Sequence, residues 1–238
     1  HISDVPIEPL SEHTISGKPT MRTDARQKIT GEAKFAGDIQ LPDMLYAKIL
    51  RPPSHDARLK SVDVSKAKKV SDAVVVEEDG LIAVLHKNPE VAEKILALIT
   101  ASWEEYEPDF DNKSVFDFLK KAAPDDGRMH VKQGNLAEGK SSATQDIESE
   151  FYNHYVAHSP MEPYTVVADV LDETATVWAS TQAPFRVQDT VAETLNIPEE
   201  NVRVITPFLG GGFGGKKSGR QISEAVRLSK ISGHPVQL

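Results

Sequence analysis

The chain has 238 residues, enough for one large domain or two modest ones, and its 39% hydrophobic and 26% charged residues are typical of a soluble globular protein. The formal net charge of −9 gives it no general attraction for nucleic acid or anionic membranes, and no apolar run approaches the roughly 18 residues of a membrane span. The sequence has no cysteine, which excludes a disulfide, a thiolate zinc site and a cysteine-bound iron–sulfur cluster within these residues.

The two ends of the sequence do not resemble the ends of a natural domain. The chain opens on His1 instead of methionine, and residues 2–9 show no signal peptide. The last five residues are typical of the opening of a strand, which predicts that the sequence is truncated at Leu238. Residues 1–17 are polar and contain two prolines, so we expect an extended lead-in there.

Region 18–126 predicts an α+β unit of strands around one helix. The strands expected from apolar or alternating residues are 45–50, 73–77, 81–86 and 103–106. Asp79-Gly80 marks a turn, so the second and third of these strands are expected to form a hairpin. Asn88 followed by Pro89 is typical of a helix N-terminus. The apolar face expected for this helix is Val91, Ile95, Leu98 and Ile99.

The middle of the chain gives the weakest signals, and regular patterns return after it. We expect a short helix at 115–121 and a linker over 127–145. From residue 146 a second unit is expected, with strands at 165–171, 174–180 and 201–206 and a helix that begins at Pro184 and buries Val187, Val191 and Leu195. A last helix would bury Ile222, Ala225 and Val226 and end at Gly233.

The most informative segment is the loop Gly210–Gly215, in which five of six residues are glycine and Phe213 is the one side chain. Such a loop lets the backbone approach a ligand closely, permits positive φ, and offers amides at the start of a helix. The residues leave four interpretations of this loop open: a surface loop without function, or one of three kinds of ligand site. One of these sites, the dinucleotide fingerprint, lacks the acidic residue that should follow about 20 positions later.

A phosphate-binding P-loop is the second kind of site. Gly210 to Lys216 satisfies the spacing of its glycines and lysine. The next residue should carry a hydroxyl for magnesium, but Lys217 stands there and Ser218 comes one position late. The missing magnesium ligand disfavours this reading.

The third reading rests on motifs spread over residues 18–238. In chain order they are Gly31-Glu32-Ala33-Lys34-Phe35-Ala36-Gly37-Asp38-Ile39, Met44-Leu45-Tyr46-Ala47, Arg51-Pro52-Pro53-Ser54-His55-Asp56-Ala57-Arg58, Met161-Glu162-Pro163, Thr181-Gln182-Ala183-Pro184, Val202-Arg203-Val204 and the loop Gly210 to Lys216. Together they resemble the molybdopterin-binding large subunit of the xanthine dehydrogenase/aldehyde oxidase family of molybdenum hydroxylases. The segment Asp79–Leu85 departs from the family pattern and suggests a divergent branch near the isoquinoline or nicotinate oxidoreductase-like members.

The resemblance implies an α+β fold in two parts. Residues 18–126 would be the family's α/β hammerhead domain, 127–145 a linker, and 146–238 the truncated N-terminal part of a mixed αβ molybdenum-cofactor-binding domain. The cofactor would be molybdopterin or its cytosine dinucleotide form. Partners would be a subunit with [2Fe-2S] clusters, a flavin or cytochrome subunit, and the remainder of the molybdenum subunit.

The resemblance also implies an activity: hydroxylation of an aldehyde or N-heteroaromatic carbon with oxygen from water, with electrons passed to iron–sulfur clusters. The family's general base is a glutamate expected beyond Leu238, so no catalytic residue is expected within the chain, and the chain alone is expected to be inactive. No metal ligand is expected, because the pterin holds the molybdenum. The compartment is left open between the cytoplasm and the periplasm of a bacterium.

The resemblance assigns the cofactor to a small set of residues, namely Gln182, Gly211, Gly212, Phe213 and Gly214. The amide of Gln182 would donate to an oxygen ligand of molybdenum, because a carboxamide can do so without adding charge. Purine-oxidising members carry an acid two residues after the loop, where this chain has Lys217 as its substrate-side candidate. A cation cannot accept hydrogen bonds from purine N–H groups, which argues against xanthine.

Three other constellations have weaker interpretations. His154, His158 and Glu162 share a helical spacing, but Pro160 and Pro163 disfavour a helix there. His55-Asp56 lies in a motif turn and Ser159 lacks a hydrolase context.

The alternatives to a molybdenum hydroxylase are a nucleotide-binding protein that uses Gly210–Lys216 and a non-catalytic scaffold that kept the fold.

Overall fold

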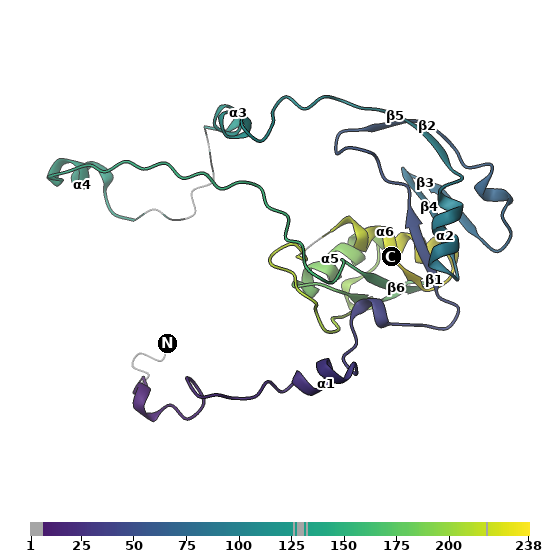
Figure 1. Ribbon diagram of the computed structural model, residues 1–238, viewed down its shortest axis with the longest axis horizontal. Helices are drawn as coiled ribbons and strands as arrows, with labels where there is room; N and C mark the ends of the chain where they lie inside the picture. Colours follow the sequence, from purple (N-terminus) through teal and green to yellow (C-terminus); the bar gives the residue numbers. More distant parts are fainter. Residues whose placement is uncertain (1–6, 126, 128–130, 132, 218) are drawn as a thin grey trace. The chain divides into compact units, whose positions relative to one another are not determined.

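The computed structural model of the chain describes residues 7–125, 127, 131, 133–217 and 219–238 (Figure 1). Contacts within the chain divide it into two compact units. The first takes in residues up to Leu50, Val64–Ile99 and Pro160–Leu238. The second takes in Arg51–Asp63 and Thr100–Ser159.

A mixed seven-stranded sheet forms the centre of the first unit. Its strands lie in the order β3-β4-β1-β9-β6-β7-β8. Their bounds are β1 Leu45–Ile49, β3 Val74–Glu78, β4 Leu81–His86, β6 Val166–Leu171, β7 Thr174–Ala179, β8 Val202–Ile205 and β9 Val236–Gln237. The sheet takes strands from both regions that the sequence suggests as separate domains, and the domain boundaries at 126 and 145 stay predictions.

Two hairpins of this sheet confirm the strands expected from the sequence. β3 and β4 are antiparallel and join at Asp79 and Gly80, whose φ angles are 45° and 74°. Positive φ at both central residues is what a tight two-residue hairpin turn requires. β6 and β7 are likewise antiparallel, and Asp172 between them has φ of 52°. Local turn chemistry is therefore enough to place both pairs.

Three helices of the first unit form in the regions where the sequence predicts helices: α2 (Pro89–Leu96), α5 (Pro184–Leu195) and α6 (Arg220–Ser232). The helix α2 is capped by Asn88, whose Oδ1 accepts from the N–H groups of Glu90 (2.8 Å) and Val91 (3.2 Å). α6 ends at Gly233 in the left-handed conformation. One expected core residue is wrong: α2 ends before Leu98, which is exposed.

The larger core lies between the helices α5 and α6 and one face of β6, β7 and β8 (Figure 1). Alternate residues of each strand face these helices, as a half-covered sheet requires. The core includes the expected Val187, Val191, Leu195, Ile222, Ala225 and Val226. A second cluster joins β1, β3 and β4 to Leu228 of α6 through Val236.

β9 connects the two halves of the sheet. It pairs in parallel with β1 and antiparallel with β6, and Val236 is fully buried. The sequence suggests a strand opening at 234–238, but its partners lie about 190 and 70 residues away along the chain. Only the tertiary structure identifies them.

The second unit contains a two-stranded antiparallel sheet of β2 (Arg58–Asp63) and β5 (Thr100–Glu104), and the helices α3 (Val115–Ala122) and α4 (Leu136–Ser142). β5 begins three residues before the predicted strand, and α3 agrees with its prediction. β2 is missed by the sequence analysis because almost all its side chains are exposed and show no apolar alternation. α4 falls in the expected linker and buries no residue.

The remaining elements are short: α1 (Ala25–Thr30), η1 (Leu10–Glu12), η2 (Ala36–Asp38), η3 (Ala67–Lys69) and η4 (Glu199–Asn201). Together the sheet and helices confirm the predicted α+β class. In the part of the chain that the structure describes, no helix has the length and apolarity to cross a membrane.

Candidate functional site

The glycine loop lies beyond the carboxyl ends of two parallel strands. β7 and β8 run in parallel, with Trp178 opposite Ile205. β7 leads directly to Thr181 and Gln182, and β8 leads to the segment that opens the loop at Gly210. Ligands of open αβ sheets bind beyond the carboxyl ends of the strands, so this edge is the expected place for a cofactor.

Gln182 is turned toward the loop by two backbone amides. Its Oε1 accepts from the N–H of Gly214 (3.0 Å) and more weakly from that of Lys216 (3.4 Å). Both partners are donors, so the carboxamide oxygen must face the loop and the amide nitrogen must face away from it. The NH₂ group has no acceptor among the described residues. Two neutral donors are therefore available to an oxygen ligand outside the loop.

Two glycines of the loop permit a close approach that no other residue would allow. A Cβ atom on Gly212 would lie 2.5 Å from Oε1 of Gln182, and one on Gly210 would collide with Cβ of Glu162. Gly212 is also buried. Steric contact with the flanking side chains, more than freedom of φ, makes glycine necessary at these two positions.

Phe213 has an unusual backbone conformation. Its φ is +50°, which is rare for a bulky residue, and its side chain is 73% exposed. Gly211 and Gly214 on either side also have positive φ, of 100° and 95°. Backbone strain of this kind is concentrated at ligand sites, where it serves to hold a group in place. The ring of Phe213 is thus presented outward from the loop.

A buried ion pair lies beneath the loop. Nζ of Lys216 contacts Oε2 of Glu162 at 2.8 Å and the carbonyl of Pro163 at 3.3 Å. The Lys216 side chain is 3% exposed and that of Glu162 is 11% exposed. The N–H of Gly210 donates to the same carboxylate oxygen at 2.8 Å. This pair was not predicted: the sequence marked each residue within a different motif, and nothing in either motif signals that they meet.

The free backbone donors of the loop fit an oxygen-rich ligand. The N–H groups of Gly211, Gly212 and Phe213 donate to no acceptor in the described part of the chain. Successive free amides on a glycine loop bind anionic or oxo groups. Oε1 of Glu162 is also buried without a partner among those residues. No group of three or more His, Asp or Glu side chains within the described ranges is arranged to bind a metal directly.

Tyr164 borders the far end of the loop. A Cβ on Gly219 would lie 2.5 Å from Cε1 of its ring. Burial raises the pKa of the Tyr164 phenol above its usual value, because the charged phenolate is poorly solvated there. The phenol is therefore a neutral group at physiological pH.

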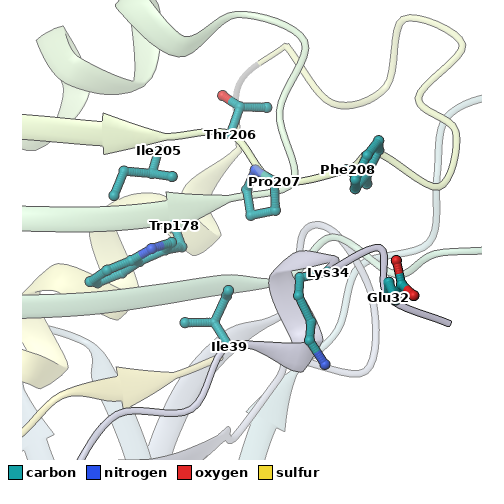
Figure 2. A pocket seen from close by; sticks show the side chains of 8 residues that line it. All are labelled: Glu32, Lys34, Ile39, Trp178, Ile205, Thr206, Pro207 and Phe208. Carbon is teal, nitrogen blue, oxygen red and sulfur yellow. The ribbon is translucent and has the colours of Figure 1, made fainter. Parts of the chain in front are cut away.

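The stem of the loop is attached to the N-terminal motif Gly31–Ile39. The N–H of Phe208 donates to the carbonyl of Lys34 at 3.0 Å, and the rings of Phe35 and Phe208 lie 6.2 Å apart. An adjoining cavity of about 570 Å³ lies on the sheet face opposite α5 and α6. Figure 2 shows the side chains that line it. It is lined by Glu32, Lys34, Ile39, Trp178, Ile205, Thr206, Pro207 and Phe208.

The structure brings most of the expected site residues together. The N–H of Gly214 bonds Gln182, Gly212 lies close to the Gln182 side chain, and a Cβ on Gly211 would lie 3.1 Å from the ring of Phe213. Gly214 is among the expected cofactor residues, but its N–H is bonded to Gln182. Lys217 is exposed and shows no ion pair with any described residue. The role of each residue toward the cofactor stays a prediction.

A glycine loop and a carboxamide beyond the ends of two parallel strands are features typical of a cofactor-binding protein. A model of the family described as the molybdopterin cofactor-binding domain matches residues 119–238, just over half of the chain. The chain belongs to this family. The predicted family and the molybdenum cofactor as its ligand are thereby confirmed.

Curated relatives support this assignment over most of the chain. A nicotinate dehydrogenase large molybdopterin subunit from Eubacterium barkeri is 27% identical over 86% of this chain and 56% of its own length. A probable xanthine dehydrogenase subunit from Bacillus subtilis is 29% identical over 94% of this chain and 35% of its own. The chain thus spans about half or less of these relatives.

Solved structures show the same fold. Quinoline 2-oxidoreductase from Pseudomonas putida 86 superimposes with a TM-score of 0.71 at 23% identity, over 92% of this chain and 34% of that one. CO dehydrogenase from Oligotropha carboxidovorans superimposes with a TM-score of 0.73 at 24% identity, over 93% of this chain and 34% of that one.

Proposed function

We propose that this chain is part of a molybdenum-dependent oxidoreductase that hydroxylates an aldehyde or N-heteroaromatic carbon with oxygen from water. The observation that carries the proposal is the orientation of Gln182, whose oxygen is held by two loop amides and whose NH₂ is left free. The molybdenum cofactor would supply the redox chemistry and the activation of water. The chain would supply binding, orientation and hydrogen-bond donors.

The roles of the loop follow from its geometry. Gln182 would hold an oxygen ligand of the metal as a neutral donor, which stabilises negative charge without fixing a cation there. The free N–H groups of Gly211, Gly212 and Phe213 would face the cofactor, and the exposed ring of Phe213 would form one wall of the substrate space. The N–H of Gly214 would reach the cofactor only after exchanging its bond to Gln182.

The rest of the reaction would need groups from outside the chain. Without cysteine the chain cannot hold an iron–sulfur cluster, so electrons would leave through a partner that carries [2Fe-2S] clusters, and from there to a flavin or cytochrome subunit. The general base would be a glutamate of the same subunit beyond Leu238. We therefore expect no turnover from these 238 residues by themselves.

Lys217 narrows the class of substrate. It is an exposed cation next to the loop, with no ion pair to any described residue. A lysine can only donate hydrogen bonds and attracts negative charge. We infer that the substrate is an N-heteroaromatic ring that carries a carboxylate. The relatives named as nicotinate dehydrogenases agree with such an anion.

The test of the proposed activity is the metal itself. The complete natural gene product that carries this chain would be produced with its neighbouring subunits in a host that makes the cofactor. Near-stoichiometric molybdenum by elemental mass spectrometry, with fluorescence of the oxidised pterin, is the expected result. A protein free of both would refute the proposal and turn attention to nucleotide binding by Gly210–Lys216 or to a scaffold role.

The substrate class can be tested by reversing one charge. Lys217→Glu should raise KM for a carboxylate-bearing substrate about tenfold and leave KM for an uncharged heteroaromatic nearly unchanged, because one exposed charge contributes on the order of 1 kcal/mol. Steady-state kinetics with the matched pair of substrates is the measurement. Lys230→Glu, on the last turn of α6, is the control for net charge. Equal changes for both substrates would contradict the assignment of Lys217.

A further inference from the structure

We propose that Glu162 and Lys216 are positioning residues that close the glycine loop at both ends and thereby fix the orientation of the Gln182 carboxamide. The inference rests on the proposed function for its consequence, the retention of the cofactor. Its geometric part concerns only this chain. Neither residue would touch the reacting atoms.

One carboxylate oxygen joins the two ends of the loop. Oε2 of Glu162 accepts from the N–H of Gly210, the first loop residue, and from Nζ of Lys216, the residue just after the last glycine, both at 2.8 Å. The backbone of Glu162 also donates to the carbonyl of Gly210 at 3.3 Å. A six-residue span rich in glycine has little stiffness of its own, so this bridge limits the distance between its ends.

Lys216 extends the same connection to Gln182. Its carbonyl accepts from the backbone N–H of Gln182 at 2.8 Å and from the hydroxyl of Thr181 at 3.0 Å, and its own N–H donates to Oε1 of Gln182 at 3.4 Å. A displacement of Lys216 would therefore remove acceptors and donors from both the backbone and the side chain of Gln182. The amide that should face the cofactor would lose its fixed direction.

Burial explains why this pair is a positioning device more than a source of stability. A buried ion pair commonly gains no more from attraction than it loses by leaving water, and apolar replacements of both partners are often as stable. What such a pair contributes is specificity, since each charge is satisfied in one arrangement of its partners only. Here that arrangement sets the spacing between Gly210 and Lys216.

The test compares single and double variants of the complete natural gene product. Lys216→Met leaves a buried carboxylate without its cation, and Glu162→Gln/Lys216→Met removes both charges. Hydrogen exchange of the loop amides reports loop position without any cofactor. Molybdenum content after dialysis reports retention. Ser229→Ala is the matched control, because it removes a buried hydroxyl of the same unit that bonds Val170 and His234, away from the loop.

The expected result separates position from stability. In Lys216→Met the backbone amides of Gly210, Gly214 and residue 216 should exchange about tenfold faster or more. This is the effect of losing a hydrogen bond to a charged group, here the bond from Nζ of Lys216 to Glu162. The double variant should recover the urea midpoint of the wild type but neither the exchange protection nor the molybdenum content. Ser229→Ala should lower the midpoint and leave the loop amides protected.

Two results would overturn the inference. One is wild-type protection of the loop amides in both variants. The other is a rate of loop-amide exchange that depends only on how far the urea midpoint has fallen. Ser229→Ala would then expose the loop amides as Lys216→Met does. Absence of molybdenum from the wild-type protein would overturn the proposed function instead, and the exchange data would still decide whether the pair positions the loop.

Discussion

The two polar atoms of the Gln182 carboxamide have different tasks. The oxygen is bound by the amides of Gly214 and Lys216, and the nitrogen faces outward. A hydroxyl would have to accept from the loop and donate its single proton through one atom, whereas the carboxamide carries two donors on a separate nitrogen. This division explains why a carboxamide, and not a hydroxyl or a charge, suits the position.

The outward nitrogen can be tested by Gln182→Glu. A glutamate keeps one oxygen for Gly214 and Lys216 but replaces the donor by a second, negatively charged acceptor. We expect kcat per bound molybdenum to fall about 10²- to 10³-fold, as when one donor to a developing oxyanion is lost. Gln188→Glu, which alters a carboxamide of α5 that bonds Glu199 and Val202, serves as control. Unchanged turnover in Gln182→Glu would refute the role of the amide nitrogen.

Tyr164 offers a pH-dependent prediction at the same scale. Burial raises the pKa of its phenol above the ordinary value of 10.0, so the folded state favours the neutral form. The stability contributed by neutral Tyr164 is fully present below about pH 10 and is lost as the pH rises through the raised folded pKa. The free energy of unfolding measured in urea should therefore fall more steeply above pH 10 for the wild type than for Tyr164→Phe. Parallel pH profiles would contradict this.

At the scale of elements, the caps of two helices have similar chemistry in different surroundings. Asn88 and Asn135 each accept from two backbone N–H groups at the start of α2 and α4. α2 buries Ala92 and Ile95, whereas α4 buries nothing. A helix that is packed contributes its cap energy to global unfolding, and an unpacked helix frays independently.

Asn88→Ala should accordingly lower the free energy of unfolding by about 1 kcal/mol, the usual effect of removing an N-cap side chain. Asn135→Ala should leave the main transition unchanged. Urea unfolding followed by circular dichroism measures both. Equal losses in the two variants would show that α4 is coupled to the packed core.

Elements set by adjacent residues were predictable, and those set by distant ones were not. The hairpin turn at Asp79-Gly80 and the left-handed Gly233 after α6 act on their own neighbours, so their residue types are sufficient. β2 is exposed along almost its whole length and is defined by its pairing with β5, some 40 residues away. No local pattern could have marked it.

At the scale of the whole molecule, β9 makes the seven-stranded sheet continuous. Val236 is fully buried, belongs to the second hydrophobic cluster, and lies opposite Leu45 of β1 and Ala168 of β6. The two-residue strand is therefore the link between the β3–β4–β1 group and the β6–β7–β8 group. Loss of packing there should weaken both groups together.

Val236→Ala should lower the free energy of unfolding by about 2 kcal/mol, the order expected when buried methyl groups leave a cavity in a core. Leu171→Ala on the same sheet, whose side chain is exposed, should change it by less than about 0.5 kcal/mol. Denaturant unfolding is followed in a Trp103→Phe background by fluorescence of Trp178, which reports the β6–β7–β8 group, and by circular dichroism, which reports both strand groups. A loss seen in only one strand group would argue against β9 as their link.

The amino-acid sequence by itself determined the family, through the ordered motifs from Gly31–Ile39 to Gly210–Lys216, and most helices and strands, through their turns, caps and apolar spacing. It also identified the loop and Gln182, because glycine-rich segments and motif residues are visible without coordinates. Only the tertiary structure decided that Glu162 meets Lys216, that Gln182 turns its oxygen inward, and that β9 joins β1 to β6. The reason is physical: such contacts join residues 32 to about 190 positions apart, and only the folded backbone brings them together.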